Sequence, residues 1–167
     1  MKYYTGVGSR KTPTKMLAAM TRVAGRLEKI GYTLRSGAAG GADAAFEAGV
    51  DKLVDSYIPW AGFSGSTSSK VGASVEAMKI AEELHPAWDR CSQGARKLHG
   101  RNVHQVLGDD LRTPSEFLIC WTPRGEKVGG TATAINLAEE NGVMVFNLAL
   151  KEEMNDFNLF LISLESR

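Results

Sequence analysis

The chain has 167 residues, which is enough for one domain with a hydrophobic core of its own. Hydrophobic residues make up 43% of it and charged residues 23%, a composition typical of a globular protein rather than a disordered one. The 20 basic and 19 acidic side chains leave a net charge of +1, which argues against a dedicated duplex-DNA-binding protein, because such proteins carry a strong basic excess. We therefore expect residues 1–167 to form a single globular domain.

The cysteines and the apolar segments indicate the cellular compartment of the protein. Cys91 and Cys120 form no CxxC pair, so we expect two reduced thiols. No apolar stretch approaches the roughly 20 residues that a membrane-spanning helix needs, and the first residues have no apolar region of the signal-peptide kind. The sequence thus predicts a cytoplasmic protein without a membrane partner.

The first half of the chain alternates short strands with helical patterns. Lys2–Val7 predicts a strand, and apolar residues at helical spacing then predict a helix from Thr14 to Ile30. Thr12, with a proline after it, is expected to cap this helix. The next predicted elements are a strand at Tyr32–Leu34, a short Ala-rich helix between Gly40 and Gly49, and a strand at Lys52–Ile58.

The second half begins with a segment of a different kind. Residues Gly62–Gly72 are rich in serine and glycine and carry no periodicity, so we expect a mobile loop. The tail from Glu152 onward is amphipathic and predicts a helix, although Phe157–Ile162 also fits a strand. Between these segments the patterns predict helices at Ser74–Leu84, Gly94–Leu111 and Gly129–Asn141, and strands at Glu116–Trp121 and Val143–Leu148.

This order of elements predicts an α/β fold. Strands separated by helices imply right-handed crossovers, and hence a mainly parallel sheet of about five strands with helices on both faces. The expected architecture is a Rossmann-like three-layer domain. In such domains ligands bind beyond the carboxyl ends of the strands.

Three glycine-rich loops lie at those ends, each between a predicted strand and a predicted helix. Free N–H groups and the helix dipole attract an anion there, and glycine lets the main chain approach phosphate without a Cβ in the way. Arg35 adds positive charge near the second loop. The predicted phosphate-binding residues are Gly8, Ser9 and Arg10 in the first loop, Ser36, Gly37, Gly40 and Gly41 in the second, and Gly129, Gly130 and Thr131 in the third.

Asp43 lies in the first turn of the helix after the second loop and has two interpretations. It either complements the helix dipole or meets a ribose hydroxyl and supports a developing positive charge on the sugar. Glu47, one turn later, shares that task or is solvated. Arg101 and Asn102 are adjacent on a predicted helix, so we expect one to face the ligand and the other to cap or pack.

The remaining candidates for chemistry give weaker patterns. His85, His99 and His104 lack a metal-ligand spacing such as HExxH, so we expect no metal site and no cofactor, and we expect His99 and His104 on a solvated helix face. Trp60 and Trp121 follow strands, where each stacks a base or shields the end of the sheet.

The loops and the Arg-Asn pair together resemble the superfamily that joins the DprA/Smf DNA-processing proteins and the LOG phosphoribohydrolases. The matching pieces are Gly6–Arg10, Ser36–Asp43, Gly100–Asn102, Gly129–Thr131 and Val145–Asn147, which span nearly the whole core. Small free-standing members of this kind also look like bacteriophage proteins. The resemblance implies a nucleotide phosphate on Gly129–Thr131, Arg101 and Asn102 beside it, and self-association as a dimer.

Two classes of function follow from these residues. In the first, an enzyme hydrolyses the N-glycosidic bond of a nucleoside monophosphate, with Asp43 and Arg101 as catalytic residues and Glu116 as a less well placed carboxylate. In the second, the protein binds without chemistry, as a nucleotide sensor or sponge or as a DprA-like single-stranded DNA-binding protein. Ala134 stands where LOG enzymes carry a glutamate, which favours the second class, whereas the sugar-side Asp43 favours the first. Local positive charge for DNA comes from Lys97, Arg101, Arg112, Arg124 and Lys127.

Overall fold

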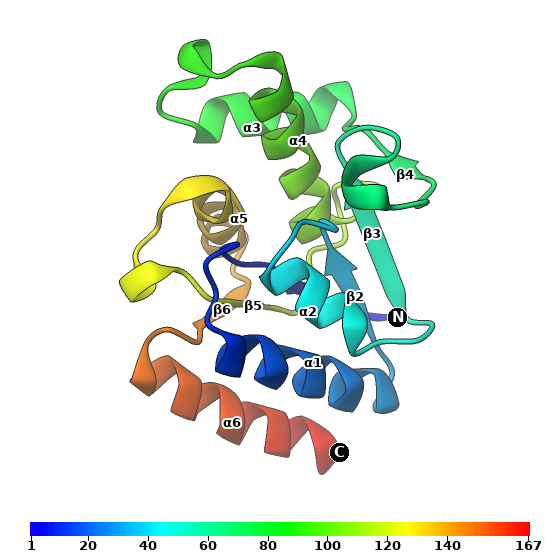
Figure 1. The fold of residues 1–167 in the computed structure, drawn as a ribbon, viewed down its shortest axis with the longest axis vertical. Helices are drawn as coiled ribbons and strands as arrows, with labels where there is room; N and C mark the ends of the chain where they lie inside the picture. The colour runs from blue at the N-terminus through cyan, green and yellow to red at the C-terminus, as the bar shows by residue number, and fades with distance from the viewer.

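The computed structural model describes all 167 residues as an α/β fold around one sheet of six parallel strands (Figure 1). The strand order is β4-β3-β2-β1-β5-β6, and every neighbouring pair is parallel. The Rossmann-like architecture is therefore confirmed, but with six strands rather than five. The strands are β1 (Lys2–Gly6), β2 (Tyr32–Ser36), β3 (Val54–Ile58), β4 (Lys70–Val71), β5 (Phe117–Cys120) and β6 (Met144–Asn147).

Six α-helices cover the two faces of this sheet. Helices α1, α2 and α6 pack on one face, and α3, α4 and α5 pack on the other (Figure 1). None of them is long and apolar enough to cross a membrane. The helices are α1 (Thr14–Lys29), α2 (Ala42–Ala48), α3 (Val75–Leu84), α4 (Gln93–Leu107), α5 (Gly129–Glu140) and α6 (Lys151–Glu165).

Each face has its own hydrophobic core because alternate residues of a strand point to opposite sides. In β5, Phe117 and Ile119 pack with α1, α2 and α6, whereas Leu118 and Cys120 pack with α3, α4 and α5. All four side chains are fully buried. Full burial of a large apolar side chain stabilises the fold by roughly 1.5–3 kcal/mol, so β5 ties both layers to the sheet.

Three local expectations change in the structure. The N-cap of α1 is Pro13, not Thr12. The hydroxyl of Thr12 instead donates to Ser9 O at 2.6 Å. The segment Gly62–Gly72, where we expect a mobile loop, contains the 3₁₀ turn Phe63–Gly65 and the short strand β4, which pairs with β3. The tail is the helix α6 throughout, not a strand at Phe157–Ile162.

The topology positions one special edge of the sheet. After β1 the chain moves to β2 and β3 on one side, and it returns to β5 and β6 on the other side of β1. The strand order therefore reverses between β1 and β5. The loops that follow these two strands diverge there, and such a switch point is where open α/β sheets bind ligands.

Candidate functional site

A cleft of about 380 Å³ lies beyond the carboxyl ends of β1 and β5. This volume is within the range of small-ligand sites. Asp43 is the only acidic residue that lines the cleft, against three basic ones. The lining residues are Val7, Gly8, Ser9, Arg10, Lys11, Ala39, Asp43, Leu98, Arg101, Asn102, Gln105, Pro123, Val128, Gly129, Gly130, Thr131 and Ala134.

The first and second loops pack closely against each other beside the cleft. A Cβ on Gly8 would lie 2.7 Å from the Cβ of Ala42, and a Cβ on Gly41 would lie 2.7 Å from the Cα of Arg10. Gly41 also has a φ of +76°, which favours glycine. These two glycines let the first and second loops close against each other, and that contact brings Ser9 and Arg10 to the cleft.

The N-terminus of α5 forms one wall. No side chain caps this end, so the N–H groups of Gly129, Gly130 and Thr131 in the first turn have no capping partner. All three residues line the cleft. The uncapped amides and the positive end of the helix dipole therefore face the space where the sequence predicts a phosphate.

Arg101 comes from α4 and is 5% exposed. Its Nη1 donates to the carbonyl oxygens of Gly37 and Tyr57, and its Nε donates to Asn102 Oδ1 at 2.9 Å. The Phe63 ring lies against the guanidinium, 5.3 Å from its carbon. Nη2 makes no hydrogen bond within the chain, so one nitrogen of Arg101 is left for a ligand, fewer than a two-nitrogen grip on phosphate needs.

Asn102 connects the guanidinium to the α5 wall. Its Oδ1 accepts from Arg101, and its Nδ2 donates to Gly130 O at 3.0 Å. Both residues of the adjacent pair line the cleft, and both polar atoms of the Asn102 side chain are hydrogen-bonded within the chain. Asn102 thus holds the helix N-terminus and the cation at a fixed separation.

Asp43 is buried beside the same guanidinium. Its Oδ2 accepts from Ala39 N at 3.2 Å, and a Cβ on Gly37 would touch both this oxygen and Arg101 Nη1. Burial raises the pKa of Asp43 to about 7, although the charge of Arg101 opposes that shift. Burial likewise lowers the pKa of Arg101, while the charge of Asp43 raises it. At neutral pH this carboxyl therefore exists in both protonation states.

Four predicted phosphate ligands are not part of the cleft lining. Ser36 is fully buried, and its hydroxyl oxygen accepts from Ala38 N at 3.3 Å. Gly37 contacts Arg101 and Asp43, Gly41 supports the first loop, and Gly40 faces open space. The second loop reaches the cleft through Ala39 and Asp43 instead.

Arg35 does not supply charge to the site. It is 2% exposed, lies over the Tyr3 ring at 4.0 Å and donates to Thr113 O at 2.6 Å. These contacts anchor the segment between α4 and β5, because the side chain leaves β2 toward α4 rather than toward the loops. Arg35 is therefore a structural residue.

Two residues of the site were missed by sequence reasoning. Lys11 follows the first loop and adds an exposed ammonium group. Gln105 is 1% exposed, and its Nε2 has no hydrogen-bond partner within the chain. A buried amide without a partner is costly, so a ligand that accepts from Gln105 would relieve that cost. Its spacing one helical turn after Arg101 was the signal that could have found it.

Several other candidates lie elsewhere. His104 is 7% exposed, accepts from Ser74 N and contacts Gly108 O, so neither it nor the half-buried His99 lies on a solvated face. Glu47 and Glu116 accept hydrogen bonds from Ser56 and Tyr32. None of these residues lines the cleft, and neither do Trp60 and Trp121.

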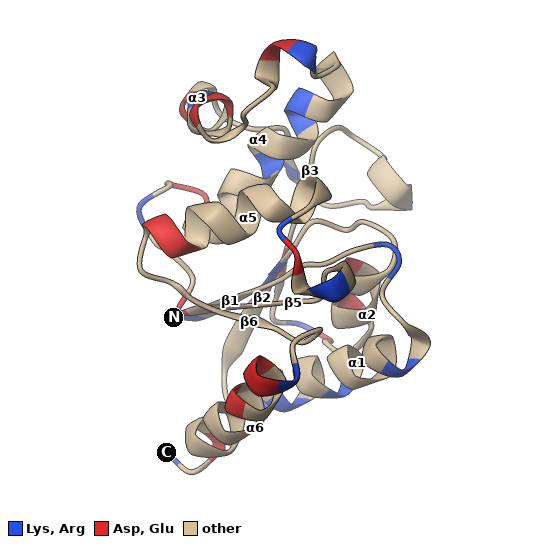
Figure 2. Cartoon of the chain, turned by 90° about the vertical axis from the view of Figure 1, so that its left-hand side faces the viewer, with Lys and Arg blue, Asp and Glu red and all other residues tan.

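Positions of basic and of acidic residues are mixed along the chain (Figure 2). Arg124 pairs with Glu126 at 3.1 Å, and Lys127 pairs with Glu139 at 2.6 Å. Two of the five cations expected to attract DNA are thereby neutralised, and a third, Arg101, is buried.

Comparison of the chain with protein-family models, curated proteins and solved structures gives no match.

Proposed function

We propose that the cleft binds the phosphate of a nucleotide or a nucleotide-like small molecule. The observation that carries this proposal is the convergence of the uncapped N-terminus of α5 with Arg10, Lys11 and Arg101 at the switch point of the sheet. Backbone amides donate to a phosphate at short range, and the cations compensate its charge. The orphaned amide of Gln105 offers a donor to the rest of the ligand.

A second candidate function is hydrolysis of the N-glycosidic bond of that nucleotide. The raised pKa of Asp43 favours it, because a carboxyl that titrates near pH 7 exchanges protons efficiently under neutral conditions. In this reaction the bond between the anomeric carbon and the base breaks, water adds to that carbon, and the base leaves with a proton. Asp43 would handle the proton, and Arg101 would hold the phosphate end.

A third candidate, single-stranded DNA binding, has less support. Arg124 and Lys127 are each paired with a glutamate, which reduces the positive charge that they offer to a strand of phosphates. DNA affinity should fall steeply with salt and rise with strand length, whereas a mononucleotide site shows a weak salt dependence and no length dependence.

The first experiment incubates the purified protein with nucleoside mono-, di- and cyclic nucleotides. Chromatography then reports both free base and ligand that stays with the protein. An intact nucleotide that co-elutes supports binding without cleavage, and release of base with sugar phosphate supports hydrolysis. If no nucleotide is retained or cleaved and only oligonucleotides bind, the small-molecule proposal is wrong.

Matched arginine variants test whether binding occurs in this cleft. Arg10 is exposed and lines it, whereas Arg22 is exposed on α1 and does not. We expect Arg10→Ala to weaken nucleotide binding about three- to tenfold, because an exposed charge contact is worth on the order of 1 kcal/mol. Arg22→Ala should leave the affinity unchanged, and equal effects of the two variants would argue against the cleft.

The Asp43→Asn variant separates the two functions of the site. If Asp43 handles the proton in hydrolysis, this variant retains nucleotide but releases no base. Undiminished base release by Asp43→Asn would remove Asp43 from the chemistry while leaving the binding proposal intact.

A further inference from the structure

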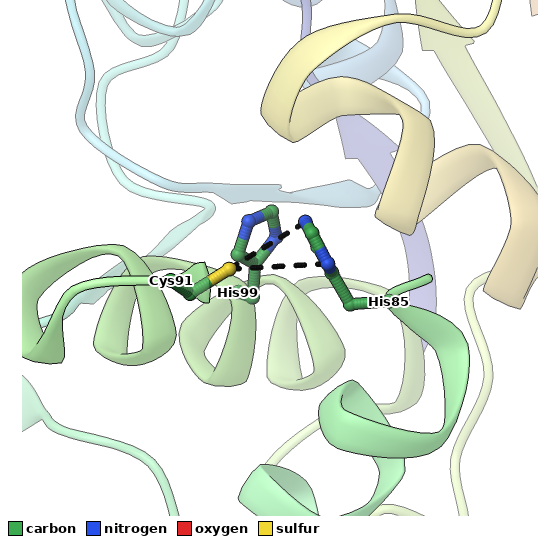
Figure 3. A group of neighbouring side chains, drawn as sticks. All are labelled: His85, Cys91 and His99. Carbon is green, nitrogen blue, oxygen red and sulfur yellow. Dashed lines mark hydrogen bonds between the residues drawn. The ribbon is translucent and has the colours of Figure 1, made fainter. Parts of the chain in front are cut away.

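A second cluster of chemically active side chains lies away from the cleft, between the end of α3 and the first half of α4. It consists of His85, Cys91 and His99 (Figure 3). Five residues separate His85 from Cys91 and seven separate Cys91 from His99, so the sequence shows none of the usual metal-ligand spacings. The fold nevertheless brings one ligand atom from each residue within 4.8 Å of the others.

The distances in this cluster fit a transition-metal ion. Cys91 Sγ lies 3.7 Å from Nε2 and 3.8 Å from Nδ1 of His85. In a tetrahedral zinc site, Zn–N and Zn–S bonds of about 2.0 and 2.3 Å hold nitrogen and sulfur roughly 3.5 Å apart. The rings of His85 and His99 meet nearly edge to face, with centroids 4.6 Å apart. The three donors lie within 4.8 Å of one another, so they would have to move closer to share one ion.

The surrounding contacts hold two of the ligands in place. His99 Nδ1 lies 3.0 Å from the Thr133 hydroxyl, which leaves Nε2 of His99 for a metal. Such an outer hydrogen bond is typical of metal-binding histidines. The turn that carries Cys91 is held by Arg96, whose Nε and Nη2 both donate to Trp88 O.

His85 is held by its neighbour in the turn. Ala87 N–H donates to His85 Nδ1 at 3.0 Å, and Cys91 Sγ lies almost equally far from the two nitrogens of this ring. A metal at Nδ1 would replace this hydrogen bond, and a metal at Nε2 would displace the proton there. In either case the metal competes with a local arrangement that already gathers the donors.

We propose that His85, Cys91 and His99 bind one divalent transition-metal ion, with Zn²⁺ as the ion that suits them. Imidazole and thiolate are the donors that zinc prefers, and hard ions such as Mg²⁺ and Ca²⁺ prefer oxygen. Three protein ligands leave a fourth position for water. The site would connect the turn after α3 to α4 and, through Thr133, to α5. Helix α4 carries Arg101 to the cleft, and α5 carries Gly130.

Cobalt titration tests this proposal in the full-length, tag-free protein after chelator treatment and under reducing conditions. Co²⁺ bound to a thiolate in a tetrahedral site gives a near-ultraviolet charge-transfer band. We expect the band to saturate at one equivalent and to be displaced by Zn²⁺. We expect Cys91→Ser to lose the band and His99→Gln to weaken binding at least about tenfold. Cys120→Ala, which removes the other thiol, should keep both.

A measurement on the wild-type protein keeps the test independent of how the variants fold. Cys91 is partly exposed and Cys120 is buried, so a maleimide should label Cys91 in the metal-free protein. One equivalent of Zn²⁺ should protect it at least about tenfold in rate, as mass spectrometry of the labelled peptides would report. Equal labelling with and without Zn²⁺, or a cobalt band that survives in Cys91→Ser, would overturn the proposal.

Discussion

At the scale of single residues, Asp43 is the side chain whose charge the fold changes most at the cleft. Its carboxyl is 5% exposed, and burial raises its pKa to about 7. The folded state therefore holds this proton more tightly than the unfolded chain does. Protonated Asp43 contributes stability that is fully present below about pH 4 and is lost as the pH rises through about 7.

The Asp43→Asn variant makes this linkage measurable. The amide that it introduces cannot ionise, so the stability of the variant should not fall through this pH window as that of the wild type does. We expect the difference in free energy of unfolding to move in favour of the variant by up to about 4 kcal/mol between pH 4 and pH 8. Urea denaturation at several pH values measures it, and a difference that is constant with pH would contradict the assigned burial of the charge.

Residue identity and spacing predicted the cleft better than they predicted its individual contacts. Gly8, Ser9, Arg10 and the residues of α5 were found because glycine-rich turns before helices have a direct physical reason to bind anions. The direction of a single side chain has no such signal. Arg35 precedes a predicted phosphate loop, yet the alternation of the strand aims it at α4 and Thr113.

At the scale of elements, the N-terminus of α5 allows binding and stability to be separated. A Cβ on Gly130 would meet no atom nearer than Asn102 Nδ2 at 4.0 Å. Gly130→Ala should therefore fold normally and stabilise α5 by roughly 0.5–1 kcal/mol, because alanine is the better helix former. The added methyl group would stand where the phosphate approaches the amides, so we expect nucleotide affinity to fall at least about tenfold.

Denaturant unfolding and equilibrium binding on the same preparation check whether Gly130→Ala raises stability while it lowers nucleotide affinity. Gly129→Ala serves as the contrast, because its φ of +65° strains any other residue and should lower stability. Unchanged affinity in Gly130→Ala would mean that the ligand does not approach this turn.

The elements themselves were predictable where their patterns were long. The 3.6-residue periodicity of α1 and the apolar runs of the longer strands match the structure closely. The strand β4 has only two residues, Lys70 and Val71, too few for any alternation to show, and it is placed by its pairing with β3. The cluster of His85, Cys91 and His99 depends on how α3 meets α4, which no local pattern contains.

At the scale of the whole molecule, the two cores make different contributions to the cleft. Residues from α4 and α5 line it, whereas α6 packs on the opposite face of the sheet and contributes none. Phe157 of α6 is 1% exposed and packs against Phe146. We expect Phe157→Ala to cost about 3–5 kcal/mol, a large share of a typical total of about 5–15 kcal/mol.

Thermal unfolding with and without nucleotide tests this division of labour. The variant should melt at a lower temperature but bind nucleotide with wild-type affinity at temperatures where it is folded. Reduced affinity in the folded variant would show that α6 supports the site through the sheet.

The expected dimer stays a prediction, which sedimentation of the 18.0 kDa chain can decide.

The close packing of Gly8 and Gly41 has a consequence for how such a protein can change over generations. The part of the cleft best suited to phosphate consists of peptide groups, which every substitution retains unless it alters the path of the chain. The surrounding side chains, such as Lys11 and Gln105, can each be exchanged by one substitution for a side chain of different chemistry. On the proposed function, descendants of this chain can therefore diverge in which molecule they accept while keeping the same main-chain contacts to its phosphate.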